Sequence, residues 1–533
     1  MKVFSLEEAR DRLLKETGPV KERDWLVPQA TASSPTNRPA LEFNETRPDL
    51  AIRKAAEVLL EAGLPLYLRL GRLVWLREVA SKDWERKPLI VKRFADEAMK
   101  ENLRDELSQL TDWRGRNGKA IPVPPPVYNM MPELAWKLGV VPEVEGLFMA
   151  PTLRPDGTVL LREGYDAATR LLLVDVPRLP AIPDRPSRAD AEAALVALKG
   201  LLREFPFRDE ADQSVALALI LATVVRGALG HIPLTVIQAP EKGSGKSFLV
   251  DIANVIATGQ RCSVVAARSE VEKWERQIAL SVASGDPIVS LDNFNGELKS
   301  DLLAQLVTQT KVKALLPYGR DMVELECRSV LTVNGNGVRV ADDLGRRVVL
   351  CRLDAGMERP WERAFEGRPL DEIGRNRGRY IAAALTIVRA YLAAGEPVDL
   401  EPLNGFEDWG RFVRGPLVWL GQVDPAATQA NAMRDDTGLQ SLGVVFAAMA
   451  EACGVGEDNA RTLNEMLGDA PAGRDGEWAR LQDAFAEAVA PKPLTPLSLG
   501  HALRKAANRV IGGHRLRNRS NRLGTKEWWI DRA

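Results

Sequence analysis

The sequence predicts an α/β protein whose central part is a parallel sheet flanked by helices. Apolar runs of strand length alternate with segments of helical periodicity from the strand before residue 240 to about residue 355, which is typical of such a sheet. A glycine-rich turn follows the first of these runs, and polar residues follow two later ones. We therefore expect the chemistry of the protein where these strands end.

Composition limits the class of protein before any motif is considered. A chain of 533 residues has room for roughly three or four domains, and its net charge of −1 argues against a wholly basic coat protein for nucleic acid. The 4 cysteines lack C-x-x-C spacing and there are only 3 histidines, which argues against a zinc site. No apolar leader is present at the N-terminus and no window approaches the length of a membrane span, so we expect a cytoplasmic protein without a membrane partner.

The N-terminal part of the chain predicts two segments. Residues 1–41 are expected to form a short helix and a flexible, proline-rich linker. Residues 42–185 predict an α+β domain, with a helix that stops at a glycine and two strands around Gly71. A second proline-rich stretch near residue 125 is expected to interrupt this domain, and a turn at Pro155, Asp156 and Gly157 joins its last strands.

Three further regions complete the predicted organisation. Residues 186–355 form the core, in which two helices with apolar residues at 3.6-residue spacing precede the alternating strands and helices. Residues 356–430 predict a mainly helical lid or connector. Residues 431–533 end in a helix followed by two short strands, which is typical of a winged-helix domain.

The segment IQAPEKGSGKSFLVDIA, residues 237–253, combines an apolar strand, a glycine turn and a helix start. This order is typical of a phosphate loop, in which backbone N–H groups at a helix N-terminus surround phosphate oxygens. Lys246 would reach the terminal phosphates and Ser247 would bind Mg²⁺. Pro240 stands where the pattern has glycine, but its fixed φ can also end the strand. The expected contacts with ATP are Pro240, Glu241, Lys242, Gly243, Ser244, Gly245, Lys246, Ser247 and Phe248.

Polar residues follow two later apolar strands. Asp292 follows one of them and is a candidate Mg²⁺ ligand, and Asn334 follows the other and could orient a water or the γ-phosphate. Asn293 occupies the position after Asp292, where a second acid usually polarises the attacking water. Three explanations stay open: a bridging water suffices, another acid such as Glu241 or Glu297 contributes, or hydrolysis is slow.

Arginines close to these strands could stabilise charge on the γ-phosphate. Arg346 and Arg347 open a strand soon after Asn334, where an arginine could act on the neighbouring subunit of a ring. The alternative is a surface salt bridge with Asp342 or Asp343. A further candidate is Arg377, which would reach the nucleotide from the helical region.

The order of these parts resembles an AAA+ ATPase of the superfamily 3 helicase type. More narrowly, it is similar to the helicase part of primase-helicases of phages, plasmids and integrative elements. The similarity extends over about residues 45–533 and includes, besides the ATPase motifs, the strings APTLRPDGTVLLREGYDAATRLLL, LDNFNG, DDLGRRVVLCRLDAGMERPWER, NRGRYIAAALTIVRAYLAAGEP and VRGPLVWLGQVDP.

This resemblance implies a hexameric ring that translocates on DNA, with ATP at the subunit interfaces. Lys246 would bind phosphate, Ser247 and Asp292 would hold Mg²⁺, and Asn334 would sense the γ-phosphate. Arg346 or Arg347 would be the arginine finger. Asn293 departs from the general helicase pattern, so the resemblance leaves the catalytic base unassigned.

Two basic regions are candidates for DNA binding. The segment TKVKALLPYGRDMVELECR predicts two strands around a turn at 317–320, where the resembled helicases have a hairpin that grips the DNA backbone. Its acids leave a solvated structural hairpin as the alternative. In the C-terminal region, a helix and a hairpin carry many cations and no acid between His501 and Lys526, which predicts a recognition helix and wing, with a charged solvated face as the alternative. The candidate DNA contacts are Lys311, Lys313, Arg320, Arg504, Lys505, Arg509, Arg515, Arg517 and Arg519.

Three functions remain compatible with these residues. The first is an ATP-dependent DNA helicase or translocase that replicates a mobile element. The second is a DNA-binding ATP switch or loader that does not unwind processively, which the missing second acid favours. The third, a primase-helicase with a degenerate primase, lacks a recognisable acid triad at its N-terminus, so priming would be absent or would belong to a separate partner.

Overall fold

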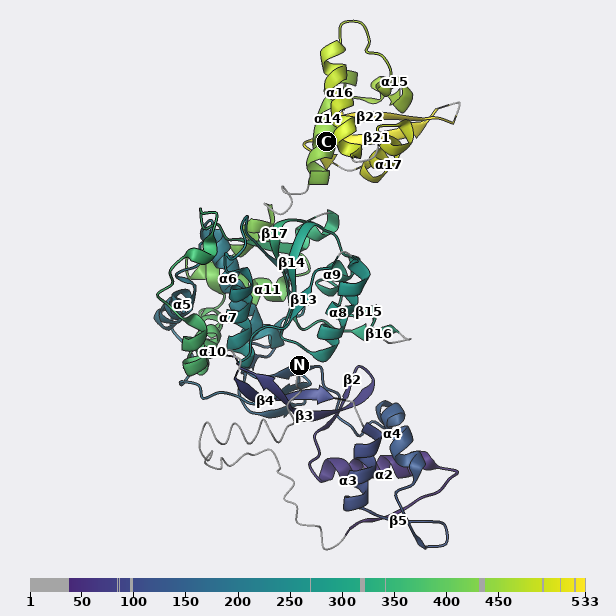
Figure 1. Ribbon diagram of the computed structural model, residues 1–533, viewed down its shortest axis with the longest axis vertical. Coiled ribbons are helices and arrows are strands. Elements are labelled where there is room, and N and C mark those ends of the chain that lie inside the picture. The colour runs from purple at the N-terminus through teal and green to yellow at the C-terminus, as the bar shows by residue number, and fades with distance from the viewer. Residues whose placement is uncertain are drawn as a thin grey trace. The chain divides into compact units, whose positions relative to one another are not determined.

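The computed structural model describes residues 38–83, 85, 87–95, 99–268, 270–316, 322–340, 342–430, 437–490, 493–508, 510–521 and 524–532. The chain forms two compact units, and each has its own core (Figure 1). Unit 1 contains the described residues up to Phe294, together with Asp301–Gly337 and Val349–Ala426. Unit 2 contains Asn295–Ser300, Val338–Val348 and the described residues from Ala427 onward.

Unit 1 begins with an α+β region that has a separate hydrophobic core. The strands predicted around Gly71 are confirmed as an antiparallel pair, and Gly71 turns between them with φ 73°. A third strand extends this sheet. Buried side chains of a second small sheet pack with the helices in the same core. The elements are β1 (Ala40–Glu42), α2 (Pro48–Glu61), β2 (Leu66–Arg69), β3 (Arg72–Lys82), β4 (Pro88–Ala95), α3 (Met99–Leu110), β5 (Asp112–Arg114), β6 (Ala120–Ile121) and α4 (Pro125–Leu138).

The proline-rich stretch near residue 125 does not interrupt the domain, so that prediction is wrong. It begins helix α4, whose first position is Pro125. Proline is tolerated there because the first helical N–H has no intrahelical partner and the ring already fixes φ near the helical value. The buried side chains of α4 then join the core of this region.

A group of short strands connects this region to the core of unit 1. Strand β7 (Gly146–Phe148) pairs in parallel with β11 (Leu171–Leu173), and β11 pairs with β10 (Gly164–Asp166). The predicted turn is confirmed between β8 (Thr152–Leu153) and β9 (Val159–Leu160), and the Gly157 N–H donates to the Arg154 carbonyl across it. Strand β7 lies at the edge of its sheet, so one row of its backbone groups is not used by strand pairing.

The centre of unit 1 is a five-stranded sheet in the order β13-β14-β17-β12-β18, with helices around it (Figure 1). The parallel α/β core predicted from the alternating pattern is therefore confirmed. The elements of this part of the chain, in which β15 and β16 form a separate pair, are β12 (Leu234–Gln238), α7 (Lys246–Thr258), β13 (Val264–Ala266), α8 (Val271–Ser284), β14 (Ile288–Leu298), α9 (Asp301–Leu306), β15 (Val312–Leu315), β16 (Met322–Leu325), β17 (Val330–Val340), η2 (Asp342–Arg347) and β18 (Val348–Arg352).

Strands β14 and β17 are longer than the apolar runs that predict them. The sequence places the strand ends at Asp292 and Asn334, but β14 continues to Leu298 and β17 to Val340. Beyond Asp292 the burial pattern changes from a continuous buried run to alternation, because the strand leaves the core there. A hydrophobic run marks the buried part of a strand and not its full length.

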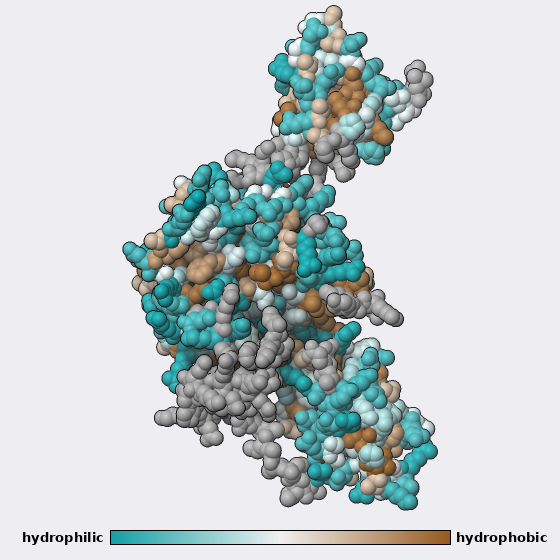
Figure 2. Space-filling model, in the orientation of Figure 1, coloured by the Kyte–Doolittle hydropathy of each residue, from teal (hydrophilic) through white to brown (hydrophobic). Residues whose placement is uncertain are grey.

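Three long helices pack against one another, and two of them, α6 and α10, also pack against α7: α5 (Arg188–Leu202), α6 (Glu210–Val225) and α10 (Pro369–Ala393). Contrary to the prediction, one helix among the described residues, Glu210–Ala228, is long and apolar enough to cross a membrane by length and composition, but 89% of its apolar window is buried inside the protein. It is buried because α7 and α10 pack against it. The face drawn in Figure 2 is largely hydrophilic, with hydrophobic residues in separate patches.

Unit 2 is built mainly from the C-terminal residues, and the predicted final helix and two strands are confirmed. Strand β22 lies between β19 and β21 in a four-stranded sheet, and helices α14, α15, α16 and α17 contribute to a core around Trp528, Phe446 and Phe485. The elements are α14 (Thr437–Cys453), β19 (Arg461–Thr462), α15 (Leu463–Leu467), α16 (Asp475–Val489), α17 (Pro496–Ala506), β20 (Val510–Ile511), β21 (His514–Ser520) and β22 (Lys526–Arg532).

Candidate nucleotide site

The phosphate loop runs from the end of β12 to the start of α7. Gly243 and Gly245 both have a left-handed backbone, with φ 73° and 96°, which few residues other than glycine adopt without strain. The Ser244 hydroxyl donates to the Glu241 carbonyl at 2.7 Å and closes the loop on itself. Pro240 is exposed at the start of the loop. The loop therefore has a compact turn at a helix N-terminus although Pro240 replaces glycine.

The Ser247 hydroxyl lies beside the Asp292 carboxylate. The hydroxyl oxygen is 3.1 Å from Oδ1 and 3.2 Å from Oδ2 of Asp292. The two residues come from the start of α7 and from β14, which the parallel sheet brings together at the carboxyl ends of its strands. A hydroxyl and a carboxylate at this distance are oxygen donors of the kind that Mg²⁺ binds, so the pair fits that ion.

The Lys246 ammonium points back over the loop to the sheet. Nζ donates to Asn336 Oδ1 at 2.7 Å and to the Glu241 carbonyl at 3.3 Å. Burial lowers the pKa of Lys246, and the nearby Asp292 carboxylate partly opposes this change. The ammonium is thus held among oxygen acceptors at the place where phosphate oxygens would enter the loop.

Asn336, and not Asn334, lies at the Lys246 ammonium. Asn334 is completely buried, its side-chain nitrogen donates to Ser290 Oγ at 3.2 Å, and its Oδ1 has no partner among the described residues. Asn336 lies two positions farther along β17 on the same side of the strand, where the strand leaves the core. The sequence carries a signal for it, since the string VNGNG contains both asparagines at a spacing of two.

Replacing Asn336 with Ala is expected to lower ATP turnover by roughly 10²-fold, because one oriented polar group beside the reacting phosphate is lost. Replacing Asn334 with Ala is expected to lower thermal stability instead, with turnover per folded molecule kept within a few-fold. Steady-state ATPase assays and melting curves of both variants distinguish these effects. If N334A loses turnover and N336A does not, the side chain at Asn334 is the relevant one.

Asn293 has a left-handed backbone with φ 60°, and its side chain is exposed. Asparagine adopts this conformation more readily than most non-glycine residues, so the local backbone gives a physical reason for Asn at this position. The positions of the two alternative acids, Glu241 and Glu297, do not identify either of them as the catalytic base. Glu241 is exposed and contributes its backbone carbonyl to the loop, and Glu297 belongs to the part of β14 that groups with unit 2.

The predicted arginine-finger residues lie in η2, which groups with unit 2. The Arg346 carbonyl accepts a hydrogen bond from the Gln429 side chain at 3.2 Å. Arg346 is exposed and Arg347 is half-buried. Their role toward a nucleotide stays a prediction.

The prediction that Arg377 reaches the nucleotide is wrong. Its guanidinium donates to the carbonyls of Ile256 and Ala257, at 2.9 Å and 2.6 Å. These carbonyls lie at the C-terminal end of α7, whereas the phosphate loop lies at the N-terminal end of the same helix. A helix of this length separates its two ends by about 20 Å. Arg377 therefore acts on the helix and not on the phosphates.

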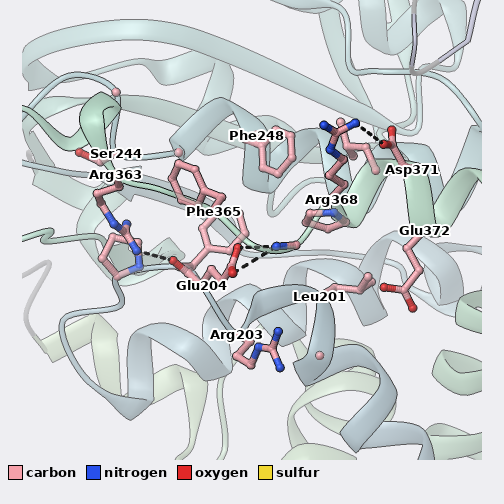
Figure 3. A pocket seen from close by; sticks show the side chains of 18 of the residues that line it. Leu201, Arg203, Glu204, Ser244, Phe248, Arg363, Phe365, Arg368, Asp371 and Glu372 are labelled. Atoms are coloured by element: carbon pink, nitrogen blue, oxygen red, sulfur yellow. Dashed lines mark hydrogen bonds and ion pairs between the residues drawn. The ribbon is translucent and has the colours of Figure 1, made fainter.

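A pocket of 560 Å³ opens beside the phosphate loop (Figure 3). Its walls come from the loop, from the connection after α5 and from the segment before α10. Phe205 stacks with Phe248 with ring centroids 6.2 Å apart, and Phe365 adds a third ring to the lining. The Glu204 carboxylate accepts the Glu366 and Gly367 N–H groups at 3.0 Å and 3.2 Å, which holds one wall in place. Phe248 is among the ATP contacts expected from the sequence, but the sequence did not indicate the other residues, because they are distant from the loop in the chain.

The predicted hairpin strands are confirmed as the antiparallel pair β15 and β16. The Lys311 ammonium forms an ion pair with Glu324 at 3.5 Å, and Lys313 lies opposite Glu324 in the register and is exposed. Arg320 and its turn lie outside the described residues. This ion pair is consistent with the sequence of the segment, in which acidic residues partly neutralise the basic ones.

The C-terminal arginines are matched by acids that are distant in sequence. Arg515, Arg517 and Arg519 alternate with buried Leu516 and so share the outer face of β21, as predicted. Strand β22 places Asp531, Trp529 and Glu527 directly opposite them. Arg517 pairs with Asp531 at 3.4 Å, and Arg519 pairs with Glu527 at 2.9 Å and also with Glu457.

The view of this region as an acid-free basic surface is therefore wrong for the β21–β22 face. The acids Glu527 and Asp531 lie after Lys526 in the chain, and strand pairing places them opposite the arginines of β21. Arg504 is exposed and donates to the Gly500 carbonyl at 2.9 Å, whereas Arg509 and the side chain of Lys505 lie outside the description. Trp528 is buried in the core of unit 2, whereas Trp529 lies on the opposite face and donates to Asp531.

Comparison with known proteins places helicases among the similar structures. No protein-family model matches the sequence, and no curated protein matches it significantly. The A form apo structure of the NrS-1 C-terminal region is 13% identical with a TM-score of 0.37, over 90% of this chain and 98% of that one. SCCmec type IV Cch, an active helicase, is 10% identical with a TM-score of 0.30, over 73% and 80%. The JCV helicase is 14% identical with a TM-score of 0.21, over 47% and 65%. Likeness at this level carries no conclusion about this chain.

Proposed function

We propose that this chain is an ATP-dependent DNA helicase or translocase that uses Mg²⁺ and works as a homohexameric ring in the replication of a mobile element. One observation carries the ATPase part of the proposal. Lys246, Ser247, Asp292 and Asn336 meet beside the glycine loop, where β12 ends and where β14 and β17 leave the buried core.

Each member of this cluster has a role in the proposal. The Lys246 ammonium and the loop N–H groups hold the β- and γ-phosphate oxygens. Ser247 and Asp292 hold Mg²⁺, which neutralises the charge on these oxygens when it is bound. The Asn336 side chain, displaced from Lys246 by the phosphate, orients the γ-phosphate or the attacking water.

The pocket beside the loop is the proposed site of the nucleobase. Its volume of 560 Å³ suits a nucleoside, and the stacked pair Phe205 and Phe248 offers an aromatic surface next to the loop. Gly245 lies against Phe205, since a Cβ at Gly245 would be 3.3 Å from that ring. The phosphates and the base would thus occupy adjoining sites formed by the same loop.

The DNA and ring parts of the proposal rest on fewer observations. The β15–β16 hairpin and the helix α17 are the proposed DNA contacts, with the C-terminal unit acting as a winged-helix domain. The arginine finger would be Arg346 or Arg347 of a neighbouring subunit. Imaging of the protein with DNA and a non-hydrolysable ATP analogue tests the ring: particles of six subunits support it, and a stable monomer contradicts an arginine acting between subunits.

A second candidate function is a DNA-binding ATP switch without processive unwinding. Asn293 favours this function, because its amide side chain stands where an acid would follow Asp292. Its left-handed backbone is a conformation that asparagine adopts more readily than most residues. Slow hydrolysis would suit a switch better than a motor.

We expect single-stranded DNA to stimulate ATP turnover several-fold and the protein to displace a strand from a forked duplex in the presence of ATP and Mg²⁺. The measurement pairs a steady-state ATPase assay with strand displacement under the same conditions. Turnover that DNA stimulates without any displacement contradicts the helicase and favours the switch. Turnover without any response to DNA contradicts both.

A further inference from the structure

Three arginines lie along the free edge of β7, of which Arg69 and Arg226 are buried and Arg377 is half-buried. Arg69 Nη1 donates to the Glu145 carbonyl at 2.7 Å, Arg226 Nη2 donates to Leu147 at 2.9 Å, and Arg377 Nη2 donates to Met149. The three acceptors alternate along the strand, so they point to the same edge. The arginines come from β2, from the turn after α6 and from α10, which are far apart in the sequence.

Two of these arginines also hold the C-terminal ends of helices. Arg377 donates to Ile256 and Ala257 at the end of α7, and Arg69 donates from Nε to Ala283 at 2.9 Å at the end of α8. Both helices end at a glycine with a left-handed backbone, Gly259 and Gly285. A positive charge at this end of a helix also interacts favourably with the helix dipole.

The space at these helix ends is closely fitted to the guanidinium groups. A Cβ at Gly285 would be 3.1 Å from Arg69 Nη2, and a Cβ at Gly259 would be 3.8 Å from Arg377 Nη1. Burial lowers the pKa of Arg69 and of Arg377 to about 10, so both guanidiniums stay charged at neutral pH. Their backbone carbonyl partners account for part of the cost of burying these charges.

The two helices lead directly to the proposed Mg²⁺ ligands. Helix α7 begins with Lys246 and Ser247, and α8 is followed at once by β14, which carries Asp292. Strand β7 is therefore tied through Arg377 to the helix that carries the hydroxyl, and through Arg69 to the helix that precedes the strand with the carboxylate. Neither arginine takes part in the hydrogen bonds described for the site.

We propose that Arg69 and Arg377 are positioning residues that use β7 to set the separation between Ser247 and Asp292, and hence the affinity for Mg²⁺. This inference rests on the proposed nucleotide function of the cluster. The loop N–H groups that bind phosphate belong to a single turn, so they do not depend on this separation. The bridge between Ser247 and Asp292 spans two elements and does depend on it.

The test compares nucleotide affinity with Mg²⁺ and with EDTA, by titration calorimetry of full-length protein with ATP analogue. In R377M and R69M, the affinity for the ATP analogue in EDTA is expected to stay within about twofold of wild type. The gain, which is the increase in this affinity that Mg²⁺ causes, is expected to fall by about tenfold, as is typical when groups that orient metal ligands are lost. R377K and R69K are expected to recover part of this gain, because a lysine keeps the charge but fewer of the hydrogen bonds. These lysine variants also serve if a methionine variant does not fold.

Arg226 provides a matched control. It is bonded to β7 like the other two and is buried like Arg69, but within the described part of the chain its side chain donates to Leu147 alone and to no helix end. R226M is expected to lose stability and to keep the full Mg²⁺ gain. An unchanged gain in R377M and R69M, or an equal loss in R226M, overturns the inference. If wild type binds no nucleotide at all, the proposed function fails, and this inference fails with it.

Discussion

ATP hydrolysis is expected to fall by at least about 10²–10³-fold when Lys246 is replaced with Ala, the largest effect on activity that we predict. The reason is electrostatic: the ammonium is the cation that the loop directs at the phosphate position, and burial strengthens its interaction there. Fold and stability should change little, since Lys246 is only half-buried and adds no packing to the core. The measurement is steady-state ATPase activity with and without DNA.

Lys242 is the matched control for this experiment. It lies in the same loop, but its side chain is exposed and only its backbone would contact phosphate. K242A is expected to keep turnover within about threefold of wild type, as exposed substitutions usually cause small changes. Equal turnover in K246A and wild type would remove the basis for the nucleotide site. An equal loss in K242A would mean that loop integrity, and not the Lys246 charge, explains the result.

The largest expected effect on stability comes from replacing Gly378 with Ala. Gly378 lies in α10 just after Asn376, where the helix is kinked, and a Cβ at Gly378 would be 1.8 Å from the Arg178 carbonyl oxygen. The obstacle is backbone and not a flexible side chain, so α10 or the 178–179 segment must move. Such overpacking costs about 3 kcal/mol, which lowers the apparent Tm by roughly 5 °C.

Gly410 is the control for this stability prediction. It lies in unit 1 with a helical backbone, and a Cβ there would have no neighbour within 4 Å. G410A is expected to leave the Tm unchanged or raise it slightly, because alanine favours helix by about 1 kcal/mol over glycine. Melting curves followed by circular dichroism give both values. A Tm for G378A that matches wild type would show that α10 does not approach Arg178 this closely.

Local patterns were sufficient to predict the elements of the core. The apolar runs, the helical periodicity and the glycine turn predicted β12, α7 and the alternating strands. This was possible because burial and backbone conformation require particular residue types at fixed spacings in the chain. They also placed Lys246, Ser247 and Asp292 in one cluster, since the carboxyl ends of parallel strands lie at one edge of a sheet.

Three of these outcomes share one cause, which is that contacts across the fold leave no mark in the local sequence. Asn334 looked like a strand end because hydrophobicity stops there, but β17 continues and brings Asn336 to Lys246. The arginines of β21 looked unpaired until strand pairing supplied Asp531 and Glu527. Arg377 looked like a ligand of the nucleotide until α10 placed it at the far end of α7.

The sequence by itself determined that this chain has a parallel α/β core with a phosphate loop, because these features depend on residues that are neighbours in the chain. Only the tertiary structure decided which asparagine faces Lys246, which arginines are neutralised, and that Arg69 and Arg377 hold two helix ends to β7. Those outcomes depend on distances between residues that are far apart in the chain. Such distances are set by packing, and no local pattern records them.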